Sequence, residues 1–206
     1  DFFLGVIPED IDFITFADPG RVASEVASRW GGKSFLLNRE ERTWRVAIAT
    51  DASRRTVDFN PVKGHSVEQD LSLRDFTINA MALDVERLVC EGGLILPRDI
   101  IDKHYGWRDL SGRILRECHD QSFLLDPVRL IRALRFRYVL GLEYEERTLN
   151  HMKKYAPLIA RVPGERIAVE LLETMSFPHA SRIFAELEST GLMQHVFPDL
   201  GERVGL

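Results

Sequence analysis

The chain has 206 residues, of which 45% are hydrophobic and 29% are charged, which is enough to bury a core in one large domain or two small ones. This composition excludes a disordered tail, and no run approaches the roughly 18 apolar residues of a membrane-spanning helix, which excludes a membrane-embedded protein. The formal net charge of −5 excludes a protein whose whole surface is basic and binds nucleic acid.

Short runs of β-forming residues dominate the first 60 residues and predict a small sheet. These runs are rich in Val, Ile, Phe, Thr and Trp and lie at residues 11–16, 34–37, 44–48 and 56–59. One helix interrupts them at residues 21–30, after Pro19 and before Gly31. A second helix is expected to begin at Ser66, because its spacing to Gln69 resembles a capping box.

From residue 122 onward the apolar residues recur with a period of 3.6, which predicts helices. The first of these helices carries a basic stripe, because Arg129, Arg132 and Arg135 recur every three residues. Further helices are expected at residues 148–160, 165–175 and 179–190. The sequence therefore predicts an α+β fold, with a small mixed-sheet head over residues 1–117 and an all-helical neck over residues 118–206.

Positive charge gathers in the middle of the chain. Residues 126–170 hold 9 basic and 6 acidic side chains, a net charge of +3, whereas the segments before and after them are net negative. If a polyanion binds, we expect it to lie along this block.

The two cysteines, Cys90 and Cys118, have no C-x-x-C spacing, which excludes a disulfide framework and a structural zinc site. The chain starts at Asp1 without a charged segment followed by an apolar one. We therefore expect a cytoplasmic protein whose chain is incomplete.

Two carboxylates, Asp10 and Asp12, begin the first predicted strand and point to one face of it, because a strand repeats every two residues. Asp58 lies between two apolar residues on another predicted strand and is a candidate third carboxylate. Such a set matches a site for two Mg²⁺ ions that performs phosphoryl displacement. A strand that shows its polar face to solvent explains an isolated D-x-D pair equally well.

Two further clusters combine acidic and basic residues. Residues 74–80 (RDFTINA) place Asp75 and Asn79 on one helix face, beside an Arg74 that can meet a phosphate. Asp126 and Arg129 stand one turn apart and can address a base edge, although Asp126 before a proline is also an ordinary helix N-cap. Solvent-exposed helix faces account for both clusters without a ligand.

Taken together, the three clusters resemble class II tRNA nucleotidyltransferases and bacterial poly(A) polymerases. The resemblance extends over nearly the whole chain, at residues 1–5, 10–12, 57–59, 70–71, 74–82, 101–102, 106, 109–110, 126–136, 166–167, 170–171, 191–192 and 197–198.

The resemblance implies a role for each matching position. Three carboxylates would be catalytic and hold two Mg²⁺ ions: Asp10, Asp12 and Asp58. The remaining matched positions would bind the nucleotide: Gly5, Arg74, Asp75, Asn79, Asp126, Arg129, Arg132 and Arg135. The partners would be CTP or ATP and the 3′ end of RNA, most simply tRNA, with base recognition and the start of the RNA-binding region in the neck.

The sequence departs from the family pattern at several points. The turn and the arginine that precede the position of Asp1 in the family are absent, Leu73 replaces a second Arg, and Leu125 replaces a Glu. Family members also continue beyond Pro198 with helices that grip tRNA. We therefore expect an incomplete triphosphate cradle and a low affinity for RNA.

The expected reaction is attack of an RNA 3′-hydroxyl on the α-phosphorus of CTP or ATP, with loss of pyrophosphate. Whether CCA, CC, A or a poly(A) tail is added stays open. Two other classes of function also stay open: a metal-dependent phosphohydrolase or nuclease that uses the same carboxylates, and an RNA-binding remnant without catalysis.

Overall fold

The computed structural model describes residues 10–49, 54–86, 99–176 and 180–201. The chain divides into two compact units, residues 1–70 and 71–206, and each is described by itself. Within the described ranges no helix is both long and apolar enough to cross a membrane. Gly5 lies outside the described residues.

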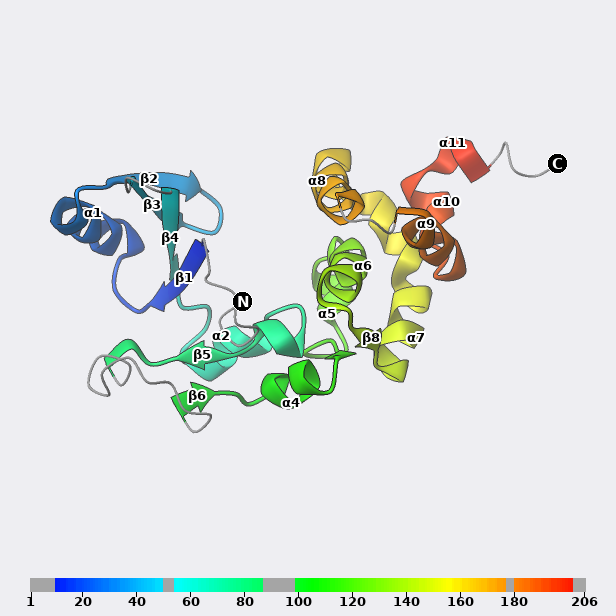
Figure 1. Cartoon of the computed structure of the whole chain (residues 1–206), viewed down its shortest axis with the longest axis horizontal. Coiled ribbons are helices and arrows are strands. Elements are labelled where there is room, and N and C mark those ends of the chain that lie inside the picture. Colours follow the sequence, from blue (N-terminus) through cyan, green and yellow to red (C-terminus); the bar gives the residue numbers. More distant parts are fainter. Residues whose placement is uncertain (1–9, 50–53, 87–98, 177–179, 202–206) are drawn as a thin grey trace. The chain divides into compact units, whose positions relative to one another are not determined.

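The first unit is a four-stranded mixed sheet with one helix against it (Figure 1). The strand order is β1-β4-β3-β2, with β1 parallel to β4 and the other neighbours antiparallel. Its elements are β1 (Asp10–Thr15), α1 (Pro19–Trp30), β2 (Lys33–Asn38), β3 (Thr43–Ala49) and β4 (Arg54–Pro61), followed by α2 (Val67–Ser72), which continues into the second unit.

Alternation along the strands sends apolar side chains to the face that α1 covers. Ala23 and Ala27 of α1 pack against Val46, Val57 and Phe59 of the sheet, and all five are buried. The polar residues between them on β3 and β4 consequently lie on the opposite face. Packing of α1 on one face thereby determines which face carries the carboxylates.

The second unit is mainly helical, with two short ladders, β5-β6 and β7-β8. Its elements are η2 (Thr77–Asn79), β5 (Ala82–Leu83), β6 (Ile100–Ile101), α4 (Gly106–Ser111), β7 (Ile114–Leu115), α5 (Ser122–Leu125), α6 (Arg129–Leu140), β8 (Glu143–Tyr144), α7 (Glu146–Tyr155), η4 (Ala156–Arg161), α8 (Gly164–Met175), α9 (Ala180–Ser189), α10 (Met193–Val196) and α11 (Pro198–Gly201).

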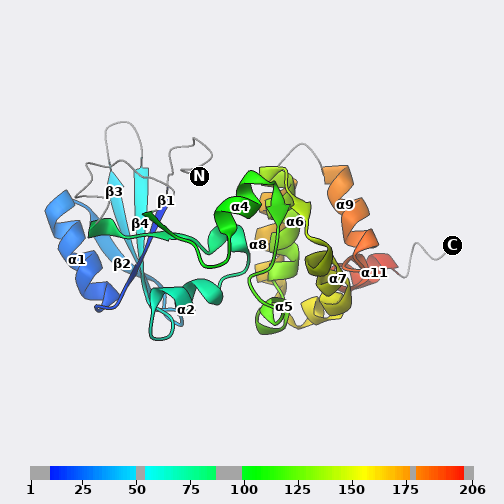
Figure 2. The ribbon, with the colours of Figure 1, turned by 90° about the horizontal axis from the view of Figure 1, so that it is seen from below.

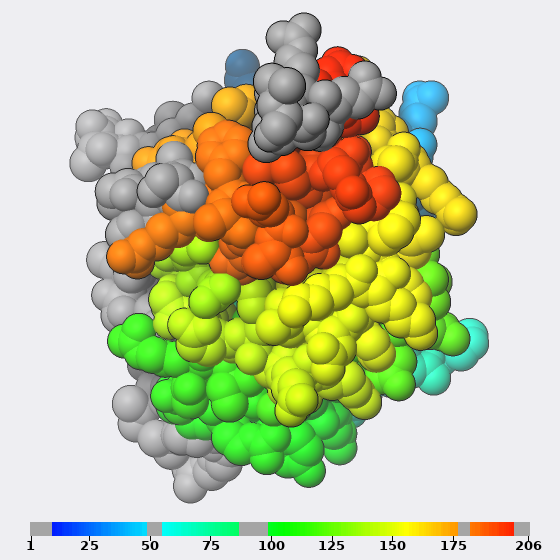
Figure 3. All heavy atoms as spheres, turned by 90° about the vertical axis from the view of Figure 1, so that its right-hand side faces the viewer, coloured from blue at the N-terminus to red at the C-terminus, as the bar shows by residue number. Residues whose placement is uncertain are grey.

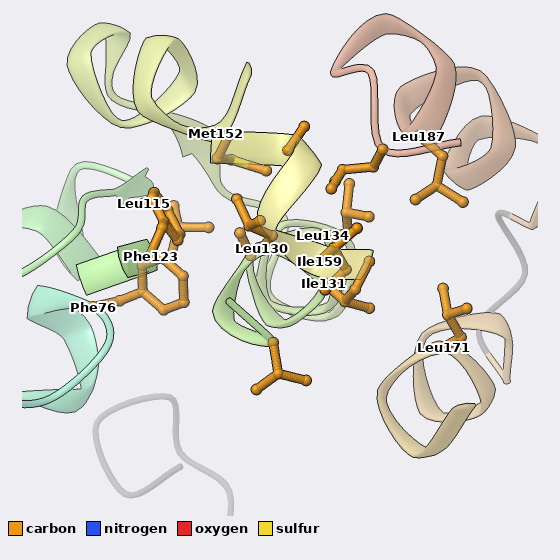
Figure 4. Close-up of a cluster of buried hydrophobic side chains, with 14 of the residues drawn as sticks. Phe76, Leu115, Phe123, Leu130, Ile131, Leu134, Met152, Ile159, Leu171 and Leu187 are labelled. Carbon is orange, nitrogen blue, oxygen red and sulfur yellow. The ribbon is translucent and has the colours of Figure 1, made fainter. Parts of the chain in front are cut away.

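Helix α6 lies in the middle of this unit, beside α8, as Figures 1 and 2 both show. Its residues Leu130, Ile131 and Leu134 are fully buried and form the centre of the core drawn in Figure 4. Figure 3 shows α9 to α11, in orange and red, packed beside α7 and η4, in yellow. A rigid, centrally buried α6 gives its polar residues fixed positions.

The predicted α+β class is confirmed, and the four predicted strands are present with ends that differ by one or two residues. Ser66 also accepts a hydrogen bond from the Gln69 N–H at 3.2 Å, as expected for the start of α2. The helix expected at residues 148–160 is divided, because Pro157 has no N–H to continue an α-helix, and η4 follows α7. The division predicted at residues 117 and 118 stays a prediction.

Candidate functional site

The parallel pairing of β1 and β4 brings the predicted carboxylates to neighbouring positions. Asp12 is paired in register with Asp58, and Asp10 is paired with Thr56. Neighbouring strands are about 4.8 Å apart, so Asp12 and Asp58 stand side by side on the face opposite α1. Asp10 and Asp12 are exposed, whereas Asp58 is only 9% exposed.

A basic residue that sequence reasoning missed stands in this group. Arg45 of β3 is paired in register with Asp58, and its guanidinium donates two hydrogen bonds of 2.7 Å to the two carboxylate oxygens. The hydrogen bond to Asp58 raises the pKa of Arg45 against the effect of burial, and the charges of Asp58, Asp10 and Asp12 raise it further. One guanidinium therefore lies within electrostatic reach of all three carboxylates.

The residue types on this face fit Mg²⁺. Carboxylate oxygens are its usual protein ligands, and one or two of them suffice when substrate phosphates supply further oxygens. In the described parts of the chain, no three acidic, histidine or cysteine side chains converge closely enough to hold an ion as they stand. Asp10 accepts a hydrogen bond from the Thr56 hydroxyl, and Asp58 is turned to Arg45.

A second polar cluster, in the second unit, is centred on Asp75. Its Oδ1 accepts hydrogen bonds from the Phe76 N–H at 2.9 Å and from the Asn79 amide at 3.1 Å, and its Oδ2 accepts one from Arg132 at 2.8 Å. Burial opposes ionisation of this carboxyl, but the Arg132 guanidinium and the hydrogen bonds hold its pKa below its usual value. Asp75 is therefore a buried anion that accepts hydrogen bonds from three donors of the protein.

The helix expected over residues 74–80 is wrong. Only Thr77–Asn79 form a single 3₁₀ turn, and Phe76 before it is extended. Phe76 is fully buried and makes an isolated antiparallel bridge with Glu117, which holds the segment extended. Asp75 and Asn79 still meet, because the turn brings them together as a helix would.

Asp126 is not the N-cap of α6. The helix begins at Arg129 with Val128 in the cap position, and Asp126 is extended. The Arg129 N–H donates to the Asp126 carbonyl at 3.1 Å, which closes a tighter three-residue turn just before the α-helix. One oxygen of the Asp126 carboxylate accepts a hydrogen bond from the Val128 N–H at 3.4 Å, and the other pairs with Arg166 of α8 at 2.9 Å.

Arg129 is fixed by three oxygens of the same unit. Its guanidinium donates to the Leu73 carbonyl at 2.8 Å, to the Ser122 hydroxyl at 2.8 Å and to the Arg74 carbonyl at 3.4 Å. The Ser122 hydroxyl in turn donates to the Asp75 carbonyl. The start of α6 is thereby tied to the segment that carries Arg74 and Asp75.

The basic stripe of α6 meets acidic residues of α8. Arg132 and Arg135 each form a 3.0 Å ion pair with Glu170, and Arg135 also pairs with Glu173. Arg166 and Glu170 lie four residues apart on α8, a spacing that suggests an ion pair within the helix, but they do not pair with each other. Arg166 binds Asp126, and Glu170 binds Arg132 and Arg135 of α6. The sequence placed Glu170 in the family resemblance and beside Arg166, but its pairing with Arg132 and Arg135, and that of Glu173 with Arg135, was missed.

The structure thus links six of the predicted nucleotide-binding residues in the second unit, by side-chain or backbone hydrogen bonds: Arg74, Asp75, Asn79, Asp126, Arg129 and Arg132. Arg135 joins them only through Glu170. The three predicted catalytic carboxylates form a separate group in the first unit.

Comparison with known proteins identifies two family regions. The family described as "Poly A polymerase head domain" matches residues 1–116, and the one described as "Probable RNA and SrmB-binding site of polymerase A" matches residues 141–203.

Curated relatives are similar along almost the whole chain. A CC-adding tRNA nucleotidyltransferase of Geobacter sulfurreducens is 34% identical over 197 residues, 96% of this chain and 43% of its own. An A-adding tRNA nucleotidyltransferase of Deinococcus radiodurans is 34% identical over 211 residues, 100% of this chain and 45% of its own. The chain spans about half the length of the curated relatives it matches.

Solved structures with a similar fold support the same family assignment. A CCA-adding enzyme in complex with ATP has a TM-score of 0.81 at 26% identity, over 96% of this chain and 46% of its own. A tRNA-processing enzyme with CTP has a TM-score of 0.80 at 27% identity, over 95% of this chain and 52% of its own. With a family match over more than half of its length, the chain belongs to the poly(A) polymerase head domain family, together with the class II tRNA nucleotidyltransferases.

Proposed function

We propose that this chain carries the catalytic head and the base-recognition helix of a tRNA nucleotidyltransferase that adds CMP, AMP or both to the 3′ end of tRNA. The observation that carries the proposal is the register of β1 and β4, which sets Asp12 beside Asp58 with Asp10 on the same face. This arrangement occurs in a chain that belongs to the family, and relatives in the same family are CC-adding and A-adding enzymes.

In the proposed reaction, the RNA 3′-hydroxyl oxygen attacks the α-phosphorus of CTP or ATP. The bond from this phosphorus to the bridging oxygen breaks, pyrophosphate leaves, and the hydroxyl proton is lost beside Asp10, Asp12 and Asp58. Two Mg²⁺ ions held by these carboxylates would offset the charge of the triphosphate and of the leaving pyrophosphate. No covalent enzyme intermediate is needed.

The second polar cluster is proposed to bind the nucleotide. Arg74, Asp75 and Asn79 would hold the ribose and the triphosphate, while Asp126 and Arg129 would pair with the edge of the base. Support comes from the preset orientation of Asp126 by Arg166 and of Arg129 by three oxygens. A fixed acceptor and a fixed donor can distinguish bases without reorganisation.

Arg132 and Arg135 are proposed to act on the nucleotide through other residues. Arg132 holds Asp75, and both arginines hold Glu170, so their charges are already balanced by acidic partners. Their contribution is therefore expected to be orientation of the cluster around Asp75 rather than phosphate charge neutralisation.

The test is a transfer assay with the full chain and labelled tRNA shortened stepwise at its 3′ end, with CTP and ATP supplied separately. The RNA should lengthen in a manner that requires Mg²⁺. Asp10→Ala and Asp12→Ala should each lower the rate by at least about 100-fold, because each removes a charge that the transition state needs.

The matched control is Asp120→Asn, which neutralises an exposed carboxylate that pairs with Arg147, and it should leave transfer unchanged. Shortening of the RNA would favour the phosphohydrolase or nuclease. Nucleotide binding that is equal in wild type, Asp10→Ala and Asp12→Ala, without any transfer, would favour the non-catalytic remnant.

A further inference from the structure

The face of the sheet that carries the carboxylates contains a cation in a fixed place. Arg45 donates from Nε and from one terminal nitrogen to both oxygens of Asp58, each at 2.7 Å. The Arg45 side chain is 28% exposed and that of Asp58 is 12% exposed, so the pair is largely shielded from water. Two short parallel bonds of this kind set both the position and the plane of the carboxylate.

The same guanidinium serves the other two carboxylates through its charge. The register that places Arg45 beside Asp58 and Asp58 beside Asp12 puts the cation two strands from β1 on one face. The influence of Asp10 and Asp12 on the pKa of Arg45 agrees with this geometry. Three neighbouring carboxylates repel one another, and a guanidinium that never loses its proton offsets one of the three charges at any physiological pH.

The bonds to Arg45 use only part of the acceptor capacity of Asp58. An ionised carboxylate has about four lone-pair positions, of which the guanidinium occupies two. The remaining positions are then presented in a direction that Arg45 determines. An Asp58 without this partner would be free to turn toward any bound cation.

We propose that Arg45 is a positioning residue for the carboxylate group of Asp10, Asp12 and Asp58, an inference that rests on the proposed function. It holds Asp58 in one orientation beside Asp12. It also weakens the attraction of this face for divalent cations, because its positive charge offsets one of the three carboxylate charges. The orientation of Asp58 depends on the two parallel hydrogen bonds from the guanidinium, whereas the attraction of the face for cations depends only on the charge of Arg45.

Two variants separate the effect of the paired hydrogen bonds from the effect of the charge. Arg45→Lys keeps the charge but loses the two parallel hydrogen bonds, and Arg45→Met loses both. Binding of Mn²⁺ to the full chain without nucleotide is measured by titration calorimetry. Arg45→Met should bind Mn²⁺ about fivefold more tightly, because a nearby positive charge is gone, and Arg45→Lys should remain within about twofold of wild type. The control is Lys33→Met, which removes an exposed cation from β2 of the same sheet and should change nothing.

Transfer kinetics at saturating Mg²⁺ give the second measurement. Both Arg45 variants should lower kcat about tenfold with an unchanged KM for CTP, because a misplaced Asp58 affects the reacting centre and not nucleotide binding. In an Asp58→Asn background, Arg45→Lys should add no further loss of kcat, since Arg45 acts on the rate through Asp58. Thermal unfolding verifies that each variant is folded. If Arg45→Met does not fold, the kcat of Arg45→Lys decides whether Arg45 positions Asp58.

Failure of this inference differs from failure of the proposed function. If wild type shows no transfer, the proposed function fails, and the Mn²⁺ titration still tests Arg45. If wild type is active and both Arg45 variants match Lys33→Met in Mn²⁺ affinity and in kcat, the positioning role is overturned. A further loss of kcat from Arg45→Lys in the Asp58→Asn background would show that Arg45 acts on the reaction by another route.

Discussion

Arg129 combines two tasks at the scale of a single residue. It is proposed to read the base, and its guanidinium also holds the Leu73 and Arg74 carbonyls and the Ser122 hydroxyl. The sequence pointed to this residue by its distance from Asp126. The backbone oxygens that fix it come from residues more than 50 positions earlier, which no local pattern reveals.

Arg129→Ala should blur the choice between CTP and ATP more than it slows transfer. A bidentate contact to a base edge contributes about 1–3 kcal/mol to discrimination, so the ratio of kcat/KM for the two nucleotides should fall by about tenfold or more. The measurement is kcat/KM for each nucleotide on the same shortened tRNA. An unchanged ratio would mean that Arg129 serves only to brace the start of α6.

At the scale of elements, the cluster around Asp75 joins the segment before η2 to α6 and, through Arg132 and Glu170, to α8. The pKa of Asp75 is lowered in the folded chain, so the folded state binds the proton less tightly than the unfolded state. The stabilisation by Asp75 is therefore complete above its ordinary pKa of 3.8 and is lost as the pH falls through the lower folded value.

Asp75→Asn should consequently lower the free energy of unfolding by about 2 kcal/mol at about pH 6, because a charge-assisted contact in a buried position is lost. The difference from wild type should shrink toward about pH 3, because below the ordinary pKa of 3.8 the unfolded wild type binds a proton at Asp75 more readily than the folded state does. Urea unfolding at both pH values measures it. Asp120→Asn, at an exposed ion pair, should change stability by less than about 1 kcal/mol, and an Asp75 effect that is equal at both pH values would contradict the assignment.

At the scale of the whole molecule, only residues 126–170 carry a net positive charge, and many of their basic side chains are already paired. Ion pairs in the structure involve Arg132, Arg135, Arg137, Arg147 and Arg166, five of the nine basic residues of this block. A basic side chain that already pairs with a carboxylate of the protein does not neutralise an RNA phosphate, and it therefore releases no counterion from the RNA. The chain should therefore contact few phosphates.

The affinity of this chain for a single-stranded RNA 3′ end should depend weakly on salt. Contact with about three phosphates predicts a slope of log K against log salt no steeper than about −2. Fluorescence anisotropy over a range of KCl concentrations measures the slope. A slope of about −4 or steeper would show that the paired arginines are released to bind RNA.

The sequence by itself determined the α+β class, the positions of the long helices and strands, and the residues to be considered, because these depend on local periodicity and on short motifs. It failed where distant packing decides the backbone. Phe76 is buried and bridged to Glu117, so residues 74–80 do not form the predicted helix.

Only the tertiary structure decided which charges meet. The register of β1, β4 and β3 sets Asp12, Asp58 and Arg45 side by side, and the packing of α6 beside α8 pairs Arg132 and Arg135 with Glu170. Sequence spacing specifies neighbours within one helix or strand. Neighbours on different elements depend on strand register and helix packing, which the burial of apolar side chains far apart in the sequence determines.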